Sequence, residues 1–111
     1  ASGPARELLS RPDRPTAVFA ANDISAIRTV EVAQQLGLRV PEDVSVVGFD
    51  NVPESALSTP SLTTIAQPLH DIGVTALRML VDLLAGREPT PGHVCLPTHL
   101  VVRDSCQPPR S

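Results

Sequence analysis

The sequence predicts an α/β fold in which a parallel sheet is flanked by helices. Three short apolar runs, at residues 16–21, 44–49 and 62–66, have the β-branched content of strands. Helical apolar repeats at residues 24–36 and 69–85 follow the first and the third run. The second run is almost continuously apolar, which suits a strand that is covered on both faces, as in a parallel sheet. The first strand, its helix and the second strand therefore form one βαβ unit.

Proline and Asx residues set the boundaries of the N-terminal elements. Residues 4–10 have the composition of the last turns of a helix. The prolines within residues 11–15 end that helix, because each disfavours helical geometry in the residue before it. After the strand at 16–21, either Asn22 or Asp23 is suited to cap the next helix, because a short side-chain oxygen accepts hydrogen bonds from the free amides of the first turn.

The helix after this cap carries apolar residues at three-residue steps, which predicts one stripe that faces the core. The stripe consists of Ile24, Ile27, Val30, Ala33 and Leu36. Gly37 stands where a left-handed cap is expected at the helix end. The strand at 44–49 then ends at the polar pair Asp50 and Asn51. One helical turn is expected at 54–57, in the loop that follows.

The last third of the chain predicts a long helix and an interrupted strand. A broad apolar face runs along residues 69–85, and Gly86 ends this helix. Residues 94–102 have the composition of a strand, but Pro97 either restricts it to a sheet edge or breaks it. The tail from Cys106 onward is expected to be loose.

Composition narrows the classes of function. The nine basic residues are arginines scattered along a chain of net charge −3, unlike a nucleic-acid-binding surface. The chain has no Gly-x-Gly-x-x-Gly motif, no phosphate loop and no lysine. His70, His93 and His99 have no partners at metal-ligand spacing. No serine lies in a Gly-x-Ser-x-Gly elbow. We therefore expect no enzymatic activity, no cofactor and no metal site.

Two features indicate the cellular compartment. No apolar run is long enough to span a membrane, and the first residues do not resemble a signal peptide. Cys95 and Cys106 are too few for a disulfide framework, so two reduced thiols are the simpler interpretation. We expect a soluble, cytoplasmic protein that does not contact membranes.

Polar side chains follow each strand of the predicted sheet. Asn22 comes after the first strand, Asp50 after the second and Gln67 after the third. The carboxyl ends of parallel strands meet at one edge, where open α/β sheets bind ligands. Carboxylate and amide groups recognise the hydroxyls of a sugar or the edge of a purine. The same residue types also serve as plain helix caps and turn formers. Asp50 is the first candidate for a ligand contact.

Four segments resemble the successive signatures of LacI/GalR-type transcriptional regulators, in that family's order and spacing. They read FAAND at 19–23, GLRVPEDVSVVGFDN at 37–51, TPSLTTIAQP at 59–68 and LPTHLVVRDS at 96–105. The resemblance covers nearly the whole chain. It implies the C-terminal part of an effector-binding domain with a partial periplasmic-binding-protein-like (type I) fold. In that fold two α/β subdomains enclose a small molecule, often a sugar or a purine.

The resemblance also implies a division of the chain and a set of effector contacts. Residues 16–66 and 97–105 are expected in the C-terminal subdomain, and residues 69–96 give a helix and a strand to the N-terminal subdomain. Family positions that contact the effector fall on Asn22, Asp50, Gln67 and Leu69. Leu69 stands where some relatives place an aromatic ring, so this chain departs from the family in its means of stacking on a sugar. Asp23 is assigned as a helix cap.

A homodimer is implied as well, with an interface on the helix from residue 24 and on the loop at 54–59. Its expected members are Ile24, Ile27, Arg28, Glu31, Gln35, Glu54, Ser55 and Ser58. The family binds operator DNA through an N-terminal helix-turn-helix domain, which these residues do not contain. The apolar face of residues 69–85 is therefore expected to need cover. Two alternatives stay open: a periplasmic sugar-binding protein of the same fold, and a structural α/β domain without a ligand.

Overall fold

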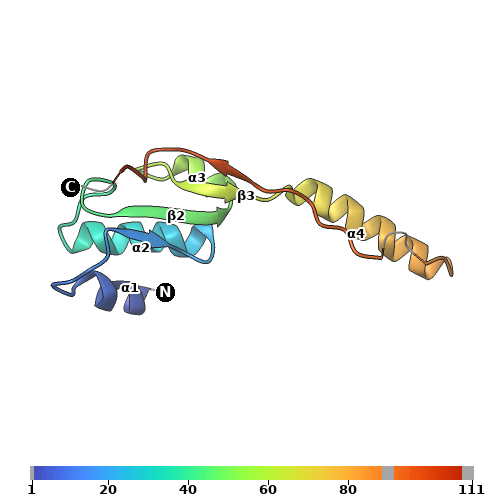
Figure 1. Cartoon of the computed structure of the whole chain (residues 1–111), viewed down its shortest axis with the longest axis horizontal. Helices are drawn as coiled ribbons and strands as arrows, with labels where there is room; N and C mark the ends of the chain where they lie inside the picture. Colours follow the sequence, from blue (N-terminus) through green and yellow to red (C-terminus); the bar gives the residue numbers. More distant parts are fainter. Residues whose placement is uncertain (1, 89–91, 109–111) are drawn as a thin grey trace. The chain divides into compact units, whose positions relative to one another are not determined.

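The computed structural model describes residues 2–88 and 92–108. The chain divides into two compact units, of which unit 1 comprises residues 1–66 and 99–111 and unit 2 comprises residues 67–98. Unit 1 holds the sheet and three helices, and unit 2 holds one long helix with the segment that returns from it (Figure 1).

Unit 1 is built on a four-stranded sheet with the strand order β1-β2-β3-β4. The strands are β1 (Ala17–Phe19), β2 (Ser45–Asp50), β3 (Thr63–Ala66) and β4 (His99–Val101). The first three strands run parallel, with Phe19 opposite Val47 and Asp50 opposite Ala66, and β4 runs antiparallel to β3. The carboxyl ends of the parallel strands therefore share one edge, as the sequence predicts.

The helices follow the predicted order. They are α1 (Ser2–Leu9), α2 (Asp23–Gln35) and α3 (Pro53–Leu57) in unit 1, and α4 (Leu69–Leu84) in unit 2. α2 packs on β2 and α1 packs on α2, so that both helices lie on the same side of the sheet (Figure 1). Gly37 has a φ of +79°, which confirms the left-handed end predicted for α2, and Gly86, which was predicted to end α4, has the same φ.

The buried face of α2 differs from the predicted stripe. Ile24 is 54% exposed and Ile27 is only half-buried, whereas Ala26 and Val30 lie in the core. Steps of three residues fall short of a helical turn by about 60° each, so a stripe built from them winds around the helix. The true face alternates steps of three and four residues. Ile24 is therefore left on the surface.

The strand predicted at residues 94–102 is shorter than expected. β4 begins only at His99, after Pro97, and residues 94–98 form no strand. Pro97 therefore lies outside the sheet ladder, because it lacks the N–H group that a ladder requires.

The segment after β4 is bound to the sheet, so the loose tail predicted from Cys106 is wrong for its first residues. Cys106 Sγ donates to the Val46 carbonyl at 3.2 Å. Gln107 N donates to Ser45 Oγ at 3.1 Å. These bonds hold the segment along β2. The remainder of the predicted tail, residues 109–111, lies outside the described residues.

Asp23 is not the cap of α2, contrary to the sequence assignment. Asn22 is the cap, because its Oδ1 accepts a hydrogen bond from Ser25 N at 2.8 Å. The Asp23 side chain is fully buried instead. Its Oδ1 accepts from Thr64 Oγ1 at 2.5 Å, and its Oδ2 accepts from Val52 N at 2.8 Å. One carboxyl group thus joins α2 to β3 and to the turn after β2.

Gly48 leaves the space that this carboxyl group occupies. A Cβ atom at Gly48 would lie 2.3 Å from Asp23 Oδ1 and 2.8 Å from Leu62 Cδ2. Both distances are shorter than van der Waals contact, and protein interiors are packed too densely to absorb such an overlap without displacement. The glycine in β2 therefore sets how closely α2 approaches the sheet.

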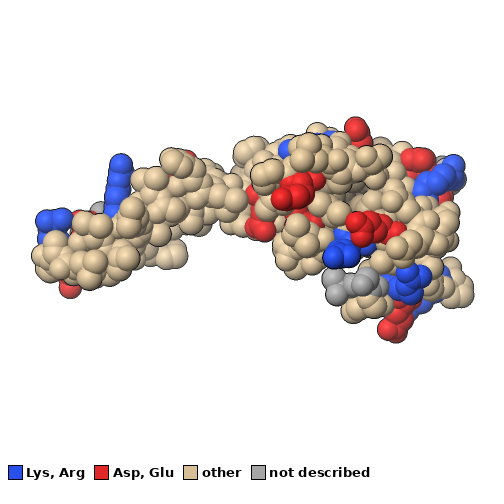
Figure 2. All heavy atoms as spheres, turned by 180° about the vertical axis from the view of Figure 1, so that it is seen from behind, with Lys and Arg blue, Asp and Glu red and all other residues tan. Residues whose placement is uncertain are grey.

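Unit 2 exposes the apolar face of α4. No residue of this helix is buried. The large apolar residues that it exposes are Leu69, Ile72, Leu77, Leu80, Val81, Leu83 and Leu84. Figure 2 shows few charged atoms on the side of this unit that it displays. An uncovered face of this size is the surface that the sequence predicts to need cover. None of the described helices is both long and apolar enough to cross a bilayer.

Gly48→Ala is expected to lower the free energy of unfolding by about 3 kcal/mol, because the added methyl group must displace the Asp23 carboxyl group or Leu62. Gly73→Ala is the matched control, since Gly73 lies within α4 and a Cβ atom there meets nothing within 4 Å. The control is expected to gain about 1 kcal/mol. Urea unfolding followed by circular dichroism measures both variants. A Gly48→Ala variant as stable as the parent protein would contradict this packing.

Candidate functional site

The carboxyl edge of the sheet in unit 1 gathers the segments that follow β1 and β2. Ala20 N donates to the Val47 carbonyl at 2.9 Å, so the chain stays beside β2 until Asn22 turns it into α2. Asp50 ends β2 opposite Ala66, the last residue of β3. The structure thus brings Asn22 and Asp50, two of the four predicted effector contacts, to the same edge.

The turn that follows β2 has a strained backbone. Asp50 has a φ of 123° and Asn51 a φ of 66°, a region that non-glycine residues rarely occupy. Each such residue costs on the order of 1–3 kcal/mol and persists only where the surrounding structure determines it. Backbone strain of this kind concentrates at binding and catalytic sites. The turn therefore marks the carboxyl end of β2 as a candidate site independently of the sequence pattern.

Arg103, which follows β4, holds this turn through its guanidinium group. Its Nη2 donates to Asn51 Oδ1 at 2.8 Å. Its Nη1 donates to Ser55 Oγ at 2.8 Å and to the Leu62 carbonyl at 3.0 Å. The backbone N–H of Arg103 donates to Thr63 Oγ1 at 2.9 Å, which fixes the start of the side chain. The sequence did not single out Arg103, and its only signal was its place in the LPTHLVVRDS segment.

The turn is held from its other side by Asp23, whose Oδ2 accepts from the backbone N–H of Val52. Hydrogen bonds therefore fix the chain immediately after Asp50 both through the Asn51 side chain and through the Val52 backbone. Asp50 itself is half-buried. A carboxyl group in this position is presented by a backbone that has little freedom to turn.

The other two predicted effector contacts belong to unit 2. Gln67 is half-buried and helps to line a groove of about 320 Å³. Ile72 and Met79 of α4 line it together with Val94 and Leu96 of the returning segment. The walls of the groove are mainly apolar, as is usual for small-molecule sites. Leu69, the first residue of α4, is 51% exposed.

The residues predicted for a dimer interface fall into three groups. Four side chains of α2 and one of α3 are exposed, namely Ile24, Arg28, Glu31, Gln35 and Glu54. Ile27 and Ser58 are half-buried. Ser55 is fully buried, where its hydroxyl donates to the Val52 carbonyl at 2.7 Å and accepts from Arg103. The predicted interface therefore loses Ser55, because a side chain bonded inside the fold has no surface to offer a second chain.

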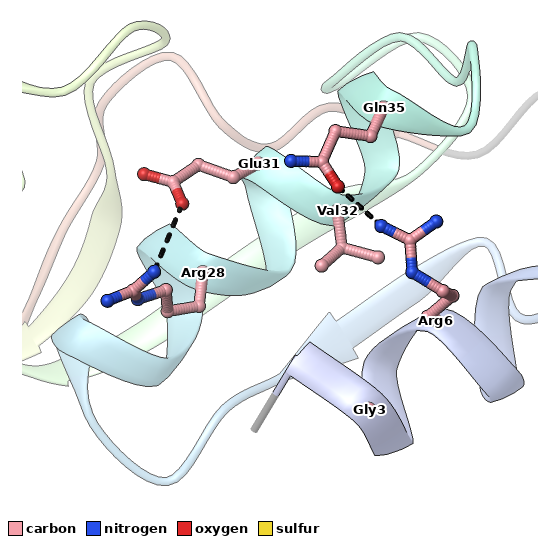
Figure 3. A pocket seen from close by; sticks show the side chains of 6 residues that line it. All are labelled: Gly3, Arg6, Arg28, Glu31, Val32 and Gln35. Carbon is pink, nitrogen blue, oxygen red and sulfur yellow. Dashed lines mark hydrogen bonds and ion pairs between the residues drawn. The ribbon is translucent and has the colours of Figure 1, made fainter.

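The exposed part of α2 forms a polar groove with α1. The groove has a volume of about 340 Å³, and Figure 3 shows its walls. Arg28 forms an ion pair with Glu31 at 3.8 Å. Arg6 of α1 donates a hydrogen bond to the side chain of Gln35. Exposed pairs of this kind contribute little to stability, so these side chains are free to be rearranged by a partner.

The cysteines and the potential metal ligands lie as follows in the described part of the chain. Cys95 and Cys106 are free. Among residues 2–88 and 92–108, no three His, Cys, Asp or Glu side chains gather closely enough to hold a metal ion.

Known proteins share this architecture. A family model described as a periplasmic binding protein-like domain matches residues 2–106. The HTH-type transcriptional repressor PurR of Escherichia coli is 43% identical over 100 residues, which cover 90% of this chain and 29% of the repressor. The chain thus spans about three tenths of the length of the curated relatives that it matches.

Several solved regulators have the same fold. A dimeric Lac repressor with an 11-residue C-terminal deletion matches with a TM-score of 0.88 and 34% identity, over 97% of this chain and 39% of that chain. A complex of the transcriptional regulator CelR with cellobiose matches with a TM-score of 0.86 and 41% identity, over 94% of this chain and 32% of that chain. A LacI family transcriptional regulator from Arthrobacter sp. FB24, in complex with lactose, matches with a TM-score of 0.84 and 31% identity, over 96% of this chain and 41% of that chain.

The family model and the relatives confirm the resemblance that the sequence motifs carry. The chain belongs to the periplasmic-binding-protein-like domain family, in the form found in the effector-binding domains of LacI/GalR-type transcriptional regulators.

Proposed function

We propose that this chain is the effector-sensing and dimerisation part of a LacI/GalR-type, DNA-binding transcriptional regulator. The observation that carries the proposal is the strained turn that presents Asp50 at the carboxyl end of β2. Two structural relatives are complexes with the sugars cellobiose and lactose. The family resemblance implies purines as a second class of possible effector. The effector is thus a small molecule of one of these two classes.

The chemistry of the site residues suits both classes of effector. The Asp50 carboxyl group accepts hydrogen bonds from a sugar hydroxyl or from a ring N–H group. Asn22 uses its Oδ1 to cap α2, which leaves its Nδ2 group as the donor for an effector oxygen. A donor beside an acceptor matches neighbouring hydroxyls, each of which both donates and accepts. Gln67 and Leu69 of unit 2 are the other two proposed contacts, and Leu69 offers apolar surface instead of a stacking ring.

The role of the whole protein follows from the same proposal. It binds operator DNA through a domain outside these residues, it acts in the cytoplasm, and it catalyses no reaction. The curated relative is a transcriptional repressor, which favours a regulator over a periplasmic sugar-binding protein of the same fold. Effector binding changes DNA affinity only if the two conformational states of the protein bind the effector unequally.

The proposed homodimer uses the exposed side of α2 and the neighbouring α3. Its contacts are Ile24, Ile27, Arg28, Glu31, Gln35, Glu54 and Ser58. Ile24 supports this surface because it is a large apolar residue on a helix whose core face lies elsewhere. The Lac repressor structure that matches this chain is described as dimeric.

Asp50→Ala is expected to weaken effector binding roughly 10- to 100-fold, because the carboxyl group accepts hydrogen bonds from the effector. Asp50→Gly is expected to lose as much affinity and yet to raise the free energy of unfolding by about 1 kcal/mol, because glycine relieves the strain at a φ of 123°. The measurements are calorimetric titration of the intact gene product against cellobiose, lactose and purine bases, and urea unfolding.

The comparison of these two variants separates recognition from strain, since both remove the carboxyl group and only one relieves the backbone. The proposed function is contradicted if the parent protein binds none of these molecules, or if Asp50→Ala binds them as tightly as the parent.

Ile24→Glu is expected to weaken the dimer of the intact gene product, because it places a charge at an apolar contact between two chains. The dissociation constant is expected to rise at least roughly tenfold in sedimentation experiments. Stability of each subunit should change little, since the side chain is exposed. Val102→Glu is the control, because Val102 is 72% exposed and lies outside the proposed interface. Equal dissociation constants for the two variants would exclude Ile24 from the interface.

A further inference from the structure

We propose that Arg103 is a positioning residue for effector recognition: it fixes the direction of the Asp50 carboxyl group by locking the left-handed turn at Asp50 and Asn51. The inference rests on the proposed function, in which Asp50 contacts the effector. Arg103 itself is not proposed to contact the effector. Its hydrogen bonds reach the turn through Asn51 and reach α3 through Ser55.

The turn needs such a lock because its backbone would otherwise relax. Aspartate and asparagine tolerate positive φ better than most residues, but two in succession is an uncommon state that neighbouring groups must impose. On its N-terminal side the turn is fixed by β2, where Asp50 pairs with Ala66. On its C-terminal side Arg103 binds the Asn51 side chain and Asp23 binds the Val52 backbone. The Ser55 hydroxyl lies 3.3 Å from the same Asn51 oxygen and donates to the Val52 carbonyl at 2.7 Å.

The shape of the guanidinium group explains why arginine performs this role. Nη2 reaches Asn51 while Nη1 reaches Ser55 and the Leu62 carbonyl, so two nitrogens of one rigid plane bind the turn and the elements that flank it. A lysine carries its three donors on one nitrogen at the end of a flexible chain, so it can reach some of these acceptors but does not hold them through a rigid plane. The three acceptors are a side-chain amide oxygen, a hydroxyl and a backbone carbonyl, so these contacts are directed hydrogen bonds.

Loss of this lock moves the carboxyl group that binds the effector. Without Arg103, Asn51 Oδ1 keeps a longer contact of 3.3 Å with the Ser55 hydroxyl, which already donates to the Val52 carbonyl. The Asn51 backbone can then return to negative φ, and the Asp50 Cα–Cβ bond rotates with the peptide that joins the two residues. Asp23 still holds Val52 and Thr64, so the sheet and α2 keep their places. The expected defect is therefore local to the turn and is seen as lost affinity with retained fold.

The first test reads the backbone directly. In NMR spectra of the intact gene product, Arg103→Met is expected to shift the backbone signals of Asp50 and Asn51 and to move their HN–Hα couplings toward values for negative φ. Arg103→Lys is expected to do the same. Arg39→Met is the matched control, because Arg39 lies before β2 and bonds only locally with Asp43, whose hydrogen bonds and charge raise the pKa of Arg39.

The second test measures affinity for whichever molecule of the panel the parent protein binds, with cellobiose, lactose and purine bases as probes. Arg103→Met and Arg103→Lys are expected to bind it roughly tenfold more weakly, because a carboxyl group that points elsewhere loses a hydrogen bond to the probe. Arg39→Met is expected to bind as the parent does. The loss caused by Arg103→Met is expected to vanish in an Asp50→Ala background, because no carboxyl group is left to position.

The outcomes separate this inference from the proposed function. Unchanged signals of Asp50 and Asn51 in Arg103→Met overturn the inference, whatever the variant binds. An affinity loss that persists in the Asp50→Ala background overturns it as well, because Arg103 would then act by another route. If no probe binds the parent protein, the proposed function fails, while the spectra still decide whether Arg103 locks the turn. If Arg103→Met does not fold, Arg103→Lys carries both measurements.

Discussion

The buried carboxyl group of Asp23 is the contact on which the arrangement of unit 1 depends. Asp23 is the first residue of α2, yet its two carboxyl oxygens bind the Thr64 hydroxyl of β3 and the Val52 amide after β2. A buried carboxyl group is costly unless donors surround it, so α2, β3 and the turn are held in the one arrangement that supplies both donors. Gly48 makes the arrangement possible, because any side chain there would occupy the place of the carboxyl group.

Most of the fold was predictable from the sequence because its signals are local. Apolar runs, prolines and the glycines that end helices report on their own neighbourhoods, and α3 and the break at Pro97 followed from them. The errors arose where a distant contact decides. Asn22 and Asp23 are equally good caps in sequence, and it is the Thr64 hydroxyl, 41 residues away, and the Val52 amide that draw Asp23 inward. The exposed position of Ile24 likewise depends on which side of α2 meets the sheet.

The location of the candidate site was predictable from the sequence, but the backbone conformation of its residues was not. Asp50 follows from its position at the end of a β-branched run, since strand ends define the edge of a parallel sheet. Nothing in the sequence requires its positive φ, because aspartate adopts that conformation only under tertiary constraint. Arg103, which supplies part of the constraint, lies 52 residues from Asn51, so no local sequence pattern reveals the contact.

The Arg103 guanidinium also joins two regions that the proposed regulator uses for different purposes. Asn51 belongs to the turn that presents Asp50, and Ser55 lies in α3, beside the exposed Glu54 of the proposed dimer surface. Because one rigid group binds both, the turn and α3 cannot move apart without the loss of a hydrogen bond. If an effector displaced Asp50 as proposed, it would therefore act on α3 through the Arg103 contacts. Coupling of this kind requires only that the two positions of the turn bind the effector with different affinity.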